Sequence, residues 1–224
     1  MKLTAEKIGR MYFRSGRDTN FFYAVQSIDF EPEEGKVTVI TGRSGSGKTT
    51  FINMLCGLLT PSCGKVMLDG KDIYALSDRE RSLLRNRSFG IIPQGQTGLQ
   101  CLTVAENVLL PVSMYGRAGE KEDKAKKLLE MLGIDDLWDV YSNELSGGEL
   151  RRMSVARALI NDPGIIVADE PTGDLDGDTT VLVMELLKKR SENGAAVIIV
   201  THDKDVMPYA DTVYTMEKGV LKKQ

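Results

Sequence analysis

The strongest constraint on this chain is a glycine-rich octapeptide between a predicted strand and a predicted helix. Residues 42–49 read GRSGSGKT and fit the pattern G-x-x-x-x-G-K-[ST]. Residues 36–42 are rich in β-branched side chains, and residues 48–59 place apolar side chains at helical spacing. The amides of such a loop and the N-terminus of the next helix form a nest for phosphate oxygens. The segment therefore predicts nucleotide binding rather than a flexible glycine turn.

The lysine and the first threonine of this loop have distinct predicted tasks. Lys48 is expected to reach the β- and γ-phosphates of the nucleotide, and the Thr49 hydroxyl is expected to ligate Mg2+. The residues expected around the phosphates are Gly42, Arg43, Ser44, Gly45, Ser46, Gly47, Lys48, Thr49 and Thr50.

A second feature is an apolar segment that ends in two carboxylates. Residues 165–170 read IIVADE, which is typical of a buried strand followed by acidic side chains. A strand beside the phosphate-binding loop would bring Asp169 to the Mg2+ ion. Glu170 would then polarise an attacking water as a general base. A strand that merely ends in solvated acids explains these residues alone, but not their combination with the octapeptide.

A third feature is the sequence LSGGE at residues 145–149, directly before a predicted helix. Ser146 and Glu149 fit the S-x-x-E capping box that stabilises a helix N-terminus. Capping alone does not require Gly147 and Gly148, because a glycine costs about 1 kcal/mol in a helix interior. Glycines let a phosphate approach the backbone closely. We therefore expect this segment both to cap its helix and to bind phosphate.

The remaining segments predict an α/β chain that a helical insert interrupts. Residues 98–160 carry apolar stripes at helical spacing, and a further helix is predicted at 178–191. Strands that are apolar throughout indicate a parallel sheet covered on both faces. Besides residues 36–42, strands are predicted at residues 65–70, 89–94, 164–169, 195–202 and 212–217, with a further short one at 219–223.

Composition argues against several classes of protein. The formal net charge of −3 is not that of a nucleic-acid binder, which usually carries a basic patch. The longest apolar run, residues 195–200, is far shorter than the roughly 20 residues of a membrane span. The first residues lack the apolar core of a signal peptide. The 3 cysteines form no CxxC pair, which argues against a disulfide framework or zinc site and favours a reducing cytosol.

Together these motifs resemble the nucleotide-binding subunit of an ATP-binding cassette (ABC) transporter. LSGGE is similar to the family's signature motif, LSGGQ, and Gln94 in FGIIPQ matches the glutamine of its Q-loop. Residues 173–176, GDLD, match the D-loop and make Asp176 a candidate contact. His202, the chain's 1 histidine, matches the switch histidine that follows a strand.

The resemblance also implies an aromatic residue that stacks on adenine. Tyr12 matches this position, with Phe13 as the alternative. Three departures from the common family pattern remove no catalytic group: Arg43 and Pro93 replace other common residues, and Glu149 replaces glutamine.

The fold implied by the resemblance is of the α/β class. It has a P-loop NTPase (RecA-like) core with a parallel sheet, a small antiparallel β subdomain and an inserted helical signature subdomain. Residues 1–224 would form a single ABC ATPase domain. Its nucleotide-binding core would comprise residues 1–95 and 161–224, and its signature subdomain residues 96–160.

The mechanism implied by the resemblance uses two copies of the chain, arranged head to tail around two ATP molecules. The catalytic residues would be Lys48, Glu170 and His202. The Mg2+ environment would be completed by Thr49, Gln94 and Asp169. The signature residues that close on the ATP of the other copy would be Ser146, Gly147, Gly148 and Glu149.

The resemblance further implies a transmembrane permease as partner, with the chain at the cytoplasmic face of the membrane and bound to it only through that permease. No nucleic-acid partner is expected. The segment LTVAENV at residues 102–108 is similar to the branch of lipoprotein-release and macrolide-export ATPases, which indicates export. We expect residues near 94–115 to line the groove for a cytoplasmic helix of the permease.

Two other functions are compatible with part of the sequence. A non-transport ABC ATPase, such as a DNA-repair or translation factor, shares the motifs, but such proteins usually carry long insertions or two cassettes. A nucleotide kinase would explain residues 42–49, but neither LSGGE nor His202.

Overall fold

The computed structural model describes residues 1–13, 21–95, 98–115 and 121–224, so the predicted boundary at residue 96 lies outside the described residues. Within them, a larger sheet of six strands has the order β10-β9-β3-β8-β7-β6. All its neighbours pair in parallel except β9 and β10. Its strands are β3 (Val37–Thr41), β6 (Phe89–Ile92), β7 (Ile165–Asp169), β8 (Ala196–Val200), β9 (Thr212–Glu217) and β10 (Val220–Lys223).

Neighbouring residues of the central strands point into two different cores, because side chains alternate along a strand. Ile165 and Val167 of β7 join the core on the side of α1 (Lys48–Leu55) and the smaller sheet. Ile166 and Ala168 join the core formed with the longer helices. The parallel sheet is therefore covered on both faces, as its uniformly apolar strands predict.

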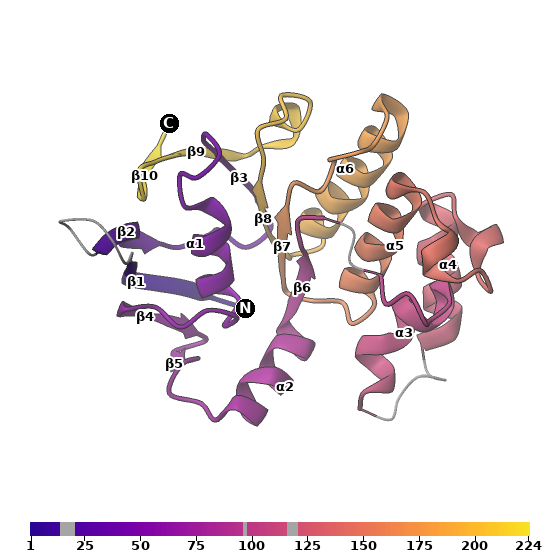
Figure 1. Cartoon of the computed structure of the whole chain (residues 1–224), viewed down its shortest axis with the longest axis horizontal. Helices are drawn as coiled ribbons and strands as arrows, with labels where there is room; N and C mark the ends of the chain where they lie inside the picture. The colour runs from indigo at the N-terminus through magenta and orange to yellow at the C-terminus, as the bar shows by residue number, and fades with distance from the viewer. Residues whose placement is uncertain (14–20, 96–97, 116–120) are drawn as a thin grey trace.

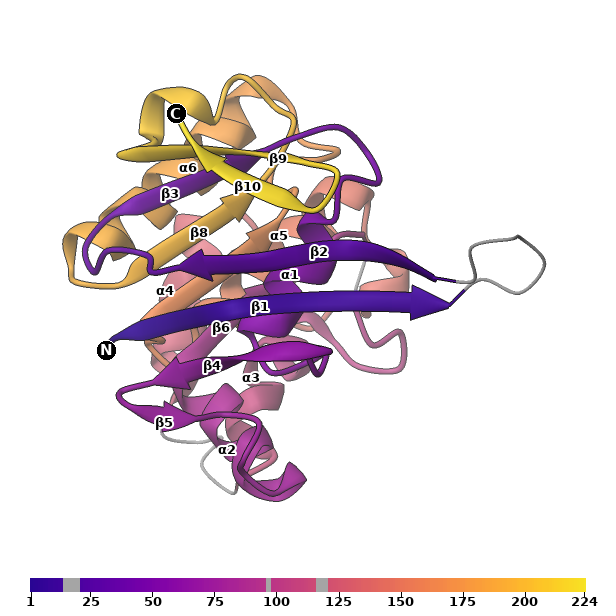
Figure 2. The same ribbon diagram turned by 90° about the vertical axis from the view of Figure 1, so that its left-hand side faces the viewer.

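The smaller sheet is antiparallel and packs on the other side of α1, as Figures 1 and 2 show. Its order is β2-β1-β4-β5 in the part of the chain that the structure describes. β1 and β2 are the two antiparallel strands of a long hairpin, which pair from Ala5 with Phe30 to Phe13 with Phe21 and lie side by side in Figure 2. The strands are β1 (Leu3–Phe13), β2 (Phe21–Phe30), β4 (Cys63–Leu68) and β5 (Lys71–Asp72).

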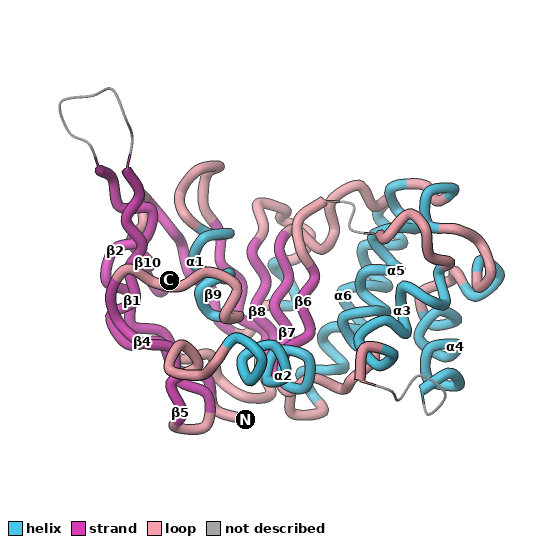
Figure 3. Tube along the Cα trace, turned by 60° about the horizontal axis from the view of Figure 1, so that its bottom comes forward, coloured by secondary structure: helices cyan, strands magenta, loops and turns pink. Residues whose placement is uncertain are grey.

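Three helices gather away from the antiparallel sheet, as Figure 3 shows: α3 (Val104–Ser113), α4 (Glu122–Met131) and α5 (Gly147–Leu159). Next to them α6 (Gly177–Glu192) covers the parallel sheet. The predicted α/β core, antiparallel subdomain and helical group are therefore all present. Short 3-10 turns occur at η2 (Asp135–Leu137), η3 (Ser142–Glu144) and η4 (Met207–Tyr209).

Several details differ from the sequence prediction, which gave no ranges for strands β1, β2 and β5. The helix predicted at residues 48–59 ends at Leu55, because Gly57 adopts a left-handed φ of 69° and turns the chain away. The helix α2 (Asp78–Ser88) was not predicted. Its sequence, DRERSLLRNRS, is too polar to show an apolar stripe, and only the capping box of Ser77 and Glu80 marks its start.

The parallel arrangement determines where the chemical groups meet. The carboxyl ends of adjacent parallel strands lie at one edge of a sheet, which is where ligands bind in such folds. β3 leads into the phosphate-binding loop, β6 leads to Gln94, and β7 ends at Asp169. β8 is followed directly by Thr201 and His202. The four segments thus deliver their side chains to the same edge.

Candidate nucleotide-binding site

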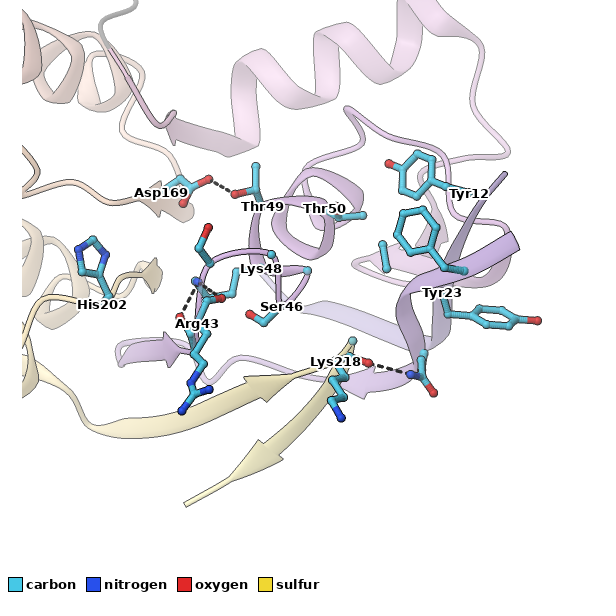
Figure 4. A pocket seen from close by; sticks show the side chains of 18 of the residues that line it. Tyr12, Tyr23, Arg43, Ser46, Lys48, Thr49, Thr50, Asp169, His202 and Lys218 are labelled. Carbon is cyan, nitrogen blue, oxygen red and sulfur yellow. Dashed lines mark hydrogen bonds between the residues drawn. The ribbon is translucent and has the colours of Figure 1, made fainter. Parts of the chain in front are cut away.

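A cavity of about 870 Å³ lies at this edge of the sheet. Figure 4 shows Tyr12 at one end of it and His202 at the other, with the phosphate-binding loop between them. The predicted site residues that line the cavity are Tyr12, Gly42, Arg43, Ser44, Gly45, Ser46, Gly47, Lys48, Thr49, Thr50, Gln94, Asp169, Glu170 and His202.

The phosphate-binding loop is shaped by contacts that leave no room for larger side chains. Gly47 caps α1 with a left-handed φ of 106°. A Cβ at this position would stand 2.1 Å from the carbonyl oxygen of Ala24, so glycine is required there. The Lys48 ammonium folds back and donates to the carbonyls of Gly42, at 2.7 Å, and Arg43, at 3.2 Å. Its charge is therefore held at the mouth of the loop.

The hydroxyl of Ser46 is a buried polar group that makes no hydrogen bond within the described residues. Buried hydroxyls are normally satisfied, because an unpaired one costs about 1–3 kcal/mol. Ser46 lines the cavity beside Lys48. A ligand oxygen in the loop would satisfy it.

Thr49 and Asp169 lie next to each other in the cavity and offer oxygen atoms that could bind a metal ion. The Thr49 hydroxyl donates to Oδ2 of Asp169 at 2.7 Å, a contact drawn in Figure 4. Burial raises the pKa of Asp169, although the hydrogen bond from Thr49 and the charge of Lys48 act in the opposite direction. A hydroxyl and a carboxylate next to a phosphate loop suit Mg2+, which usually binds one or two carboxylates plus phosphate oxygens.

No cluster of three Asp, Glu, His or Cys side chains that could hold a metal occurs among the described residues. The donor set is thus too small for an all-protein metal cage. It fits an ion that arrives with the phosphates of a nucleotide, for which Gln94 offers a further carbonyl oxygen in the same cavity.

Glu170 follows Asp169 with a left-handed φ of 52°, which is uncommon for a residue other than glycine and typical of functional sites. Both its carboxylate oxygens are engaged. Oε2 accepts hydrogen bonds from the Thr201 hydroxyl at 2.8 Å and the His202 amide at 3.3 Å. Oε1 lies 2.7 Å from Nδ1 of His202. The loop after β8 therefore holds the Glu170 carboxylate in one orientation.

The opposite end of the cavity is aromatic. The Tyr12 ring stacks on Phe22, with ring centroids 5.8 Å apart and an interplanar angle of 27°, and the Arg10 guanidinium lies 4.9 Å from the Tyr12 centroid. Phe13 is 74% exposed and does not line the cavity. Side-chain alternation in β1 explains the difference, since adjacent residues point to opposite faces. The geometry favours Tyr12 over Phe13 as the stacking residue.

The signature segment lies elsewhere. Ser146 is the N-cap of α5, and the predicted capping box is present: the Glu149 amide donates to Oγ of Ser146, and the Ser146 amide donates to Oε2 of Glu149 at 2.7 Å. The Ser146 hydroxyl also donates to Oε2 of Glu149 at 2.7 Å, and this bond together with that from the Ser146 amide lowers the pKa of the Glu149 carboxyl. Ser146, Gly147, Gly148 and Glu149 do not line the cavity of their own chain.

Asp176 likewise lies outside the cavity. It caps α6 by accepting a hydrogen bond from the Thr179 amide at 2.8 Å, which lowers the pKa of its carboxyl. The predicted nucleotide-binding residues thus fall into two groups, and only one of these groups lines the cavity.

Several lining residues were missed by the sequence analysis. Phe22 faces Tyr12 across the hairpin, and an expected hairpin register is the signal that could have found it. Gln26 donates to the Lys218 carbonyl at 2.7 Å, while the Gly219 amide donates to the Ser46 carbonyl at 2.9 Å. These contacts join segments 192 and 173 positions apart, so no local sequence pattern predicts them.

The comparison with known families identifies the chain. A family model described as "ABC transporter" matches residues 25–173. The chain belongs to the ABC transporter family. Within it, the chain is an ATP-binding subunit with ATPase activity, similar to the LolD and MacB proteins. No described helix of this ABC subunit is long and apolar enough to cross a bilayer.

Relatives match this ABC subunit over nearly its whole length. It is 38% identical over 220 residues to an uncharacterized ABC transporter ATP-binding protein of Methanocaldococcus jannaschii, covering 98% of this chain and 97% of that one. It is 37% identical to the lipoprotein-releasing system ATP-binding protein LolD of Xanthomonas campestris, covering 98% and 92%. The macrolide export ATP-binding/permease protein MacB of Aggregatibacter actinomycetemcomitans is 41% identical; the match covers 94% of this chain and 32% of MacB.

A solved structure shares the fold. It is the dimeric structure of an ATP-binding cassette in a post-hydrolysis state, bound to ADP and Pi. The two chains are 32% identical, with a TM-score of 0.89 and coverage of 99% of this chain and 98% of that one.

Proposed function

We propose that this ABC subunit forms a head-to-tail homodimer that binds two ATP molecules with Mg2+, hydrolyses them, and thereby drives a transmembrane permease that exports its substrate. The proposal rests on one observation: the predicted nucleotide-binding residues lie in two separate places of the chain's own structure. Tyr12, the phosphate-binding loop and Glu170 line one cavity, whereas Ser146 and its glycines point elsewhere. A second copy supplies the signature that the cavity lacks.

The length and polarity of the cavity suit ATP. An aromatic stack at one end takes the adenine ring, and the glycine-rich loop takes the phosphates. Lys48 is the cation nearest the loop carbonyls, so it is positioned to exchange those contacts for the β- and γ-phosphate oxygens. The far end, with Asp169 and Glu170, then receives the γ-phosphate.

Three side chains of this site would hold Mg2+: Thr49, Asp169 and Gln94. When bound, the ion supplies charge neutralisation at the β- and γ-phosphates. The hydrogen bond between Thr49 and Asp169 keeps the two oxygen ligands together before nucleotide arrives.

Hydrolysis requires a base beside the γ-phosphate. Glu170 accepts a proton from the attacking water while the water oxygen bonds to phosphorus and the bond to the β-phosphate oxygen breaks, releasing ADP. His202 and Thr201 orient the carboxylate through the contacts described above. His202, whose side chain is exposed, is also placed to meet the γ-phosphate once ATP fills the cavity.

We expect Lys48→Ala to weaken ATP binding by about 10- to 100-fold, because hydrogen bonds to charged groups are worth about 1.5–3 kcal/mol. Isothermal titration calorimetry measures the affinity. Lys71→Ala, at an exposed lysine of β5, is the matched control and should bind as the wild type does. Unchanged ATP affinity in Lys48→Ala would contradict the phosphate-loop assignment.

A groove of about 300 Å³ is the proposed permease site. It lies between α2, the end of α3 and the end of α5, so that of the predicted window 94–115 only Pro111, Met114 and Tyr115 line it. The further lining residues, which the sequence analysis missed, are Ser82, Arg85, Asn86, Phe89, Ile91, Arg157, Ala158 and Asn161.

The chemistry of the groove suits an amphipathic cytoplasmic helix that carries a carboxylate. The described lining combines apolar side chains with two arginines and contains no acidic residue. Met114, 68% exposed, offers an apolar contact at the rim. The groove also borders β6, which leads directly to Gln94 and so connects the partner to the nucleotide site.

The names of two relatives support export, and the proposed partner supports a location at the membrane. Two relatives are named for macrolide export and for lipoprotein release, which favours export for this chain as well. Binding through the permease places the subunit at the cytoplasmic face of the cell membrane. The net charge of −3 supports the expectation that nucleic acid is not a partner.

We expect Met114→Asp to reduce co-purification of the permease by about tenfold, because it loses an apolar contact and repels the partner's carboxylate. ATP binding by the isolated subunit should not change. Met131→Asp, at an exposed methionine of α4, is the control and should co-purify normally. If both variants retain the permease in detergent, the docking site lies elsewhere.

A further inference from the structure

Arg151 is a buried charge that neither the motifs nor the proposed mechanism uses. It lies in the first turns of α5, five positions after Ser146, and is only 4% exposed. Arginine is rarely buried unless its charge and donors find partners. The groups that surround the Arg151 guanidinium therefore indicate the role of this side chain.

The first partner is the chain segment that carries Gln94. Nη1 of Arg151 donates to the carbonyl oxygen of Pro93 at 2.7 Å, a short hydrogen bond with a charged donor. Pro93 directly precedes Gln94. One hydrogen bond thus ties the signature helix to the backbone that presents Gln94 to the cavity.

The second partner is the loop after β7. A Cβ at Gly173 would stand 3.8 Å from Nη2 of Arg151, so this branch of the guanidinium faces the loop. Burial lowers the pKa of Arg151, while the charges of Asp174, Asp169 and Glu170 on and beside this loop act in the opposite direction. The same turn of α5 approaches this loop at Gly148, where a Cβ would stand 3.6 Å from the Asp174 carbonyl oxygen.

We propose that Arg151 is a positioning residue for ATP hydrolysis: from the signature helix it holds the Pro93 carbonyl, and so Gln94, in place while its charge fixes the carboxylate loop that carries Glu170. The proposal rests on the proposed function, because it assumes that Gln94 and Glu170 act at the nucleotide. It adds that the signature helix of one copy sets the geometry of that copy's own hydrolytic site.

The planar guanidinium suits this task better than an ammonium. Nη1 donates to the Pro93 carbonyl while Nη2 faces the loop at Gly173, and the plane of the guanidinium fixes these two directions. Lysine carries one flexible point charge. Arg151→Lys therefore keeps the positive charge but loses this fixed geometry. Arg151→Met keeps most of the side-chain volume and loses both.

The test measures kcat, KM for ATP, ADP affinity and thermal stability for Arg151→Met and Arg151→Lys. We expect Arg151→Met to lower kcat by about tenfold or more, the size of effect typical of a lost hydrogen bond from a charged group. ADP affinity and KM should change by less than about twofold, because the phosphate loop is intact. Arg151→Lys should regain part of kcat. Arg190→Met removes a less buried arginine, which pairs with Asp162 and does not line the cavity, and should keep the wild-type kcat.

A second readout does not depend on turnover. In the nucleotide-free protein, hydrogen–deuterium exchange at the amides of Gln94 and Gly95 should be faster in Arg151→Met than in the wild type and in Arg190→Met, because the Pro93 carbonyl is released. If Arg151→Met does not fold, Arg151→Gln is compared with the wild type and with Arg190→Met in the same way.

Each possible result bears on one claim, either the role of Arg151 or the proposed function. A wild-type kcat in Arg151→Met, or equal losses of kcat and ADP affinity, overturns the inference, as does failure of both the Met and the Gln variants to fold. Glu170→Gln is measured in the same series. If it stays active, the proposed function is wrong; if it is inactive while Arg151→Met is fully active, only the role of Arg151 is wrong.

Discussion

Glu170→Gln is expected to lower the ATPase rate by about 10²- to 10⁴-fold, the contribution typical of a general base. Glutamine has nearly the same shape but does not accept a proton from water. The phosphate-binding loop, Thr49 and Asp169 are untouched, so ATP affinity should stay within about twofold of the wild type. Phosphate release and calorimetry measure the two quantities on the same preparation.

The control for this variant is Glu192→Gln at the exposed C-terminal end of α6. It removes an equal charge far from the cavity and should hydrolyse ATP normally. If Glu170→Gln turned over ATP at the wild-type rate, another group would be the base, and the contacts from Thr201 and His202 to Glu170 would need a different explanation.

Ser146→Arg is expected to reduce hydrolysis by about 100-fold or more while one chain still binds ATP with normal affinity. In the proposed dimer Ser146 closes on the nucleotide of the partner copy. A bulky cation there prevents closure, and a small misplacement of catalytic groups already costs about 100-fold in rate. ATP binding in cis is spared, because Ser146 does not line the cavity of its own chain.

The substitution also removes the N-cap of α5, so a matched control is needed. Ser77→Arg destroys the same kind of capping box at α2. Each lost cap costs about 1 kcal/mol of stability. We expect similar losses of thermal stability in the two variants, but loss of hydrolysis in Ser146→Arg only. An active Ser146→Arg dimer would show that the signature does not serve the partner's ATP.

The part of the site that could be predicted from sequence is local in the chain. The phosphate-binding loop, the capping box of Ser146 and Glu149, and the pair Asp169–Glu170 each occupy a few consecutive residues with a defined chemical pattern. The parallel sheet follows from strands apolar on both faces. Strand alternation also favours Tyr12 over Phe13, once the register of the hairpin is known.

What could not be predicted depends on distant contacts or on weak patterns. Arg151 reaches Pro93 across 58 positions, and nothing in ELRRMSV distinguishes this arginine from its neighbour Arg152. α2 has too few apolar residues for a helical stripe, although its capping box was visible in the sequence. The groove proposed as the permease site shares only three residues with the predicted window 94–115, because its other lining residues come from α2, β6, α5 and the residue Asn161.

The most direct test of the proposed dimer is the molar mass of Glu170→Gln in light scattering, with and without ATP and Mg2+. The chain of 24.7 kDa should be monomeric without nucleotide and should double its mass with ATP, since the nucleotide is bound but not hydrolysed. The double variant Glu170→Gln/Ser146→Arg should bind ATP equally well and stay monomeric. Dimerisation of both variants, or of neither, would contradict a dimer in which the signature of one copy closes on the ATP of the other.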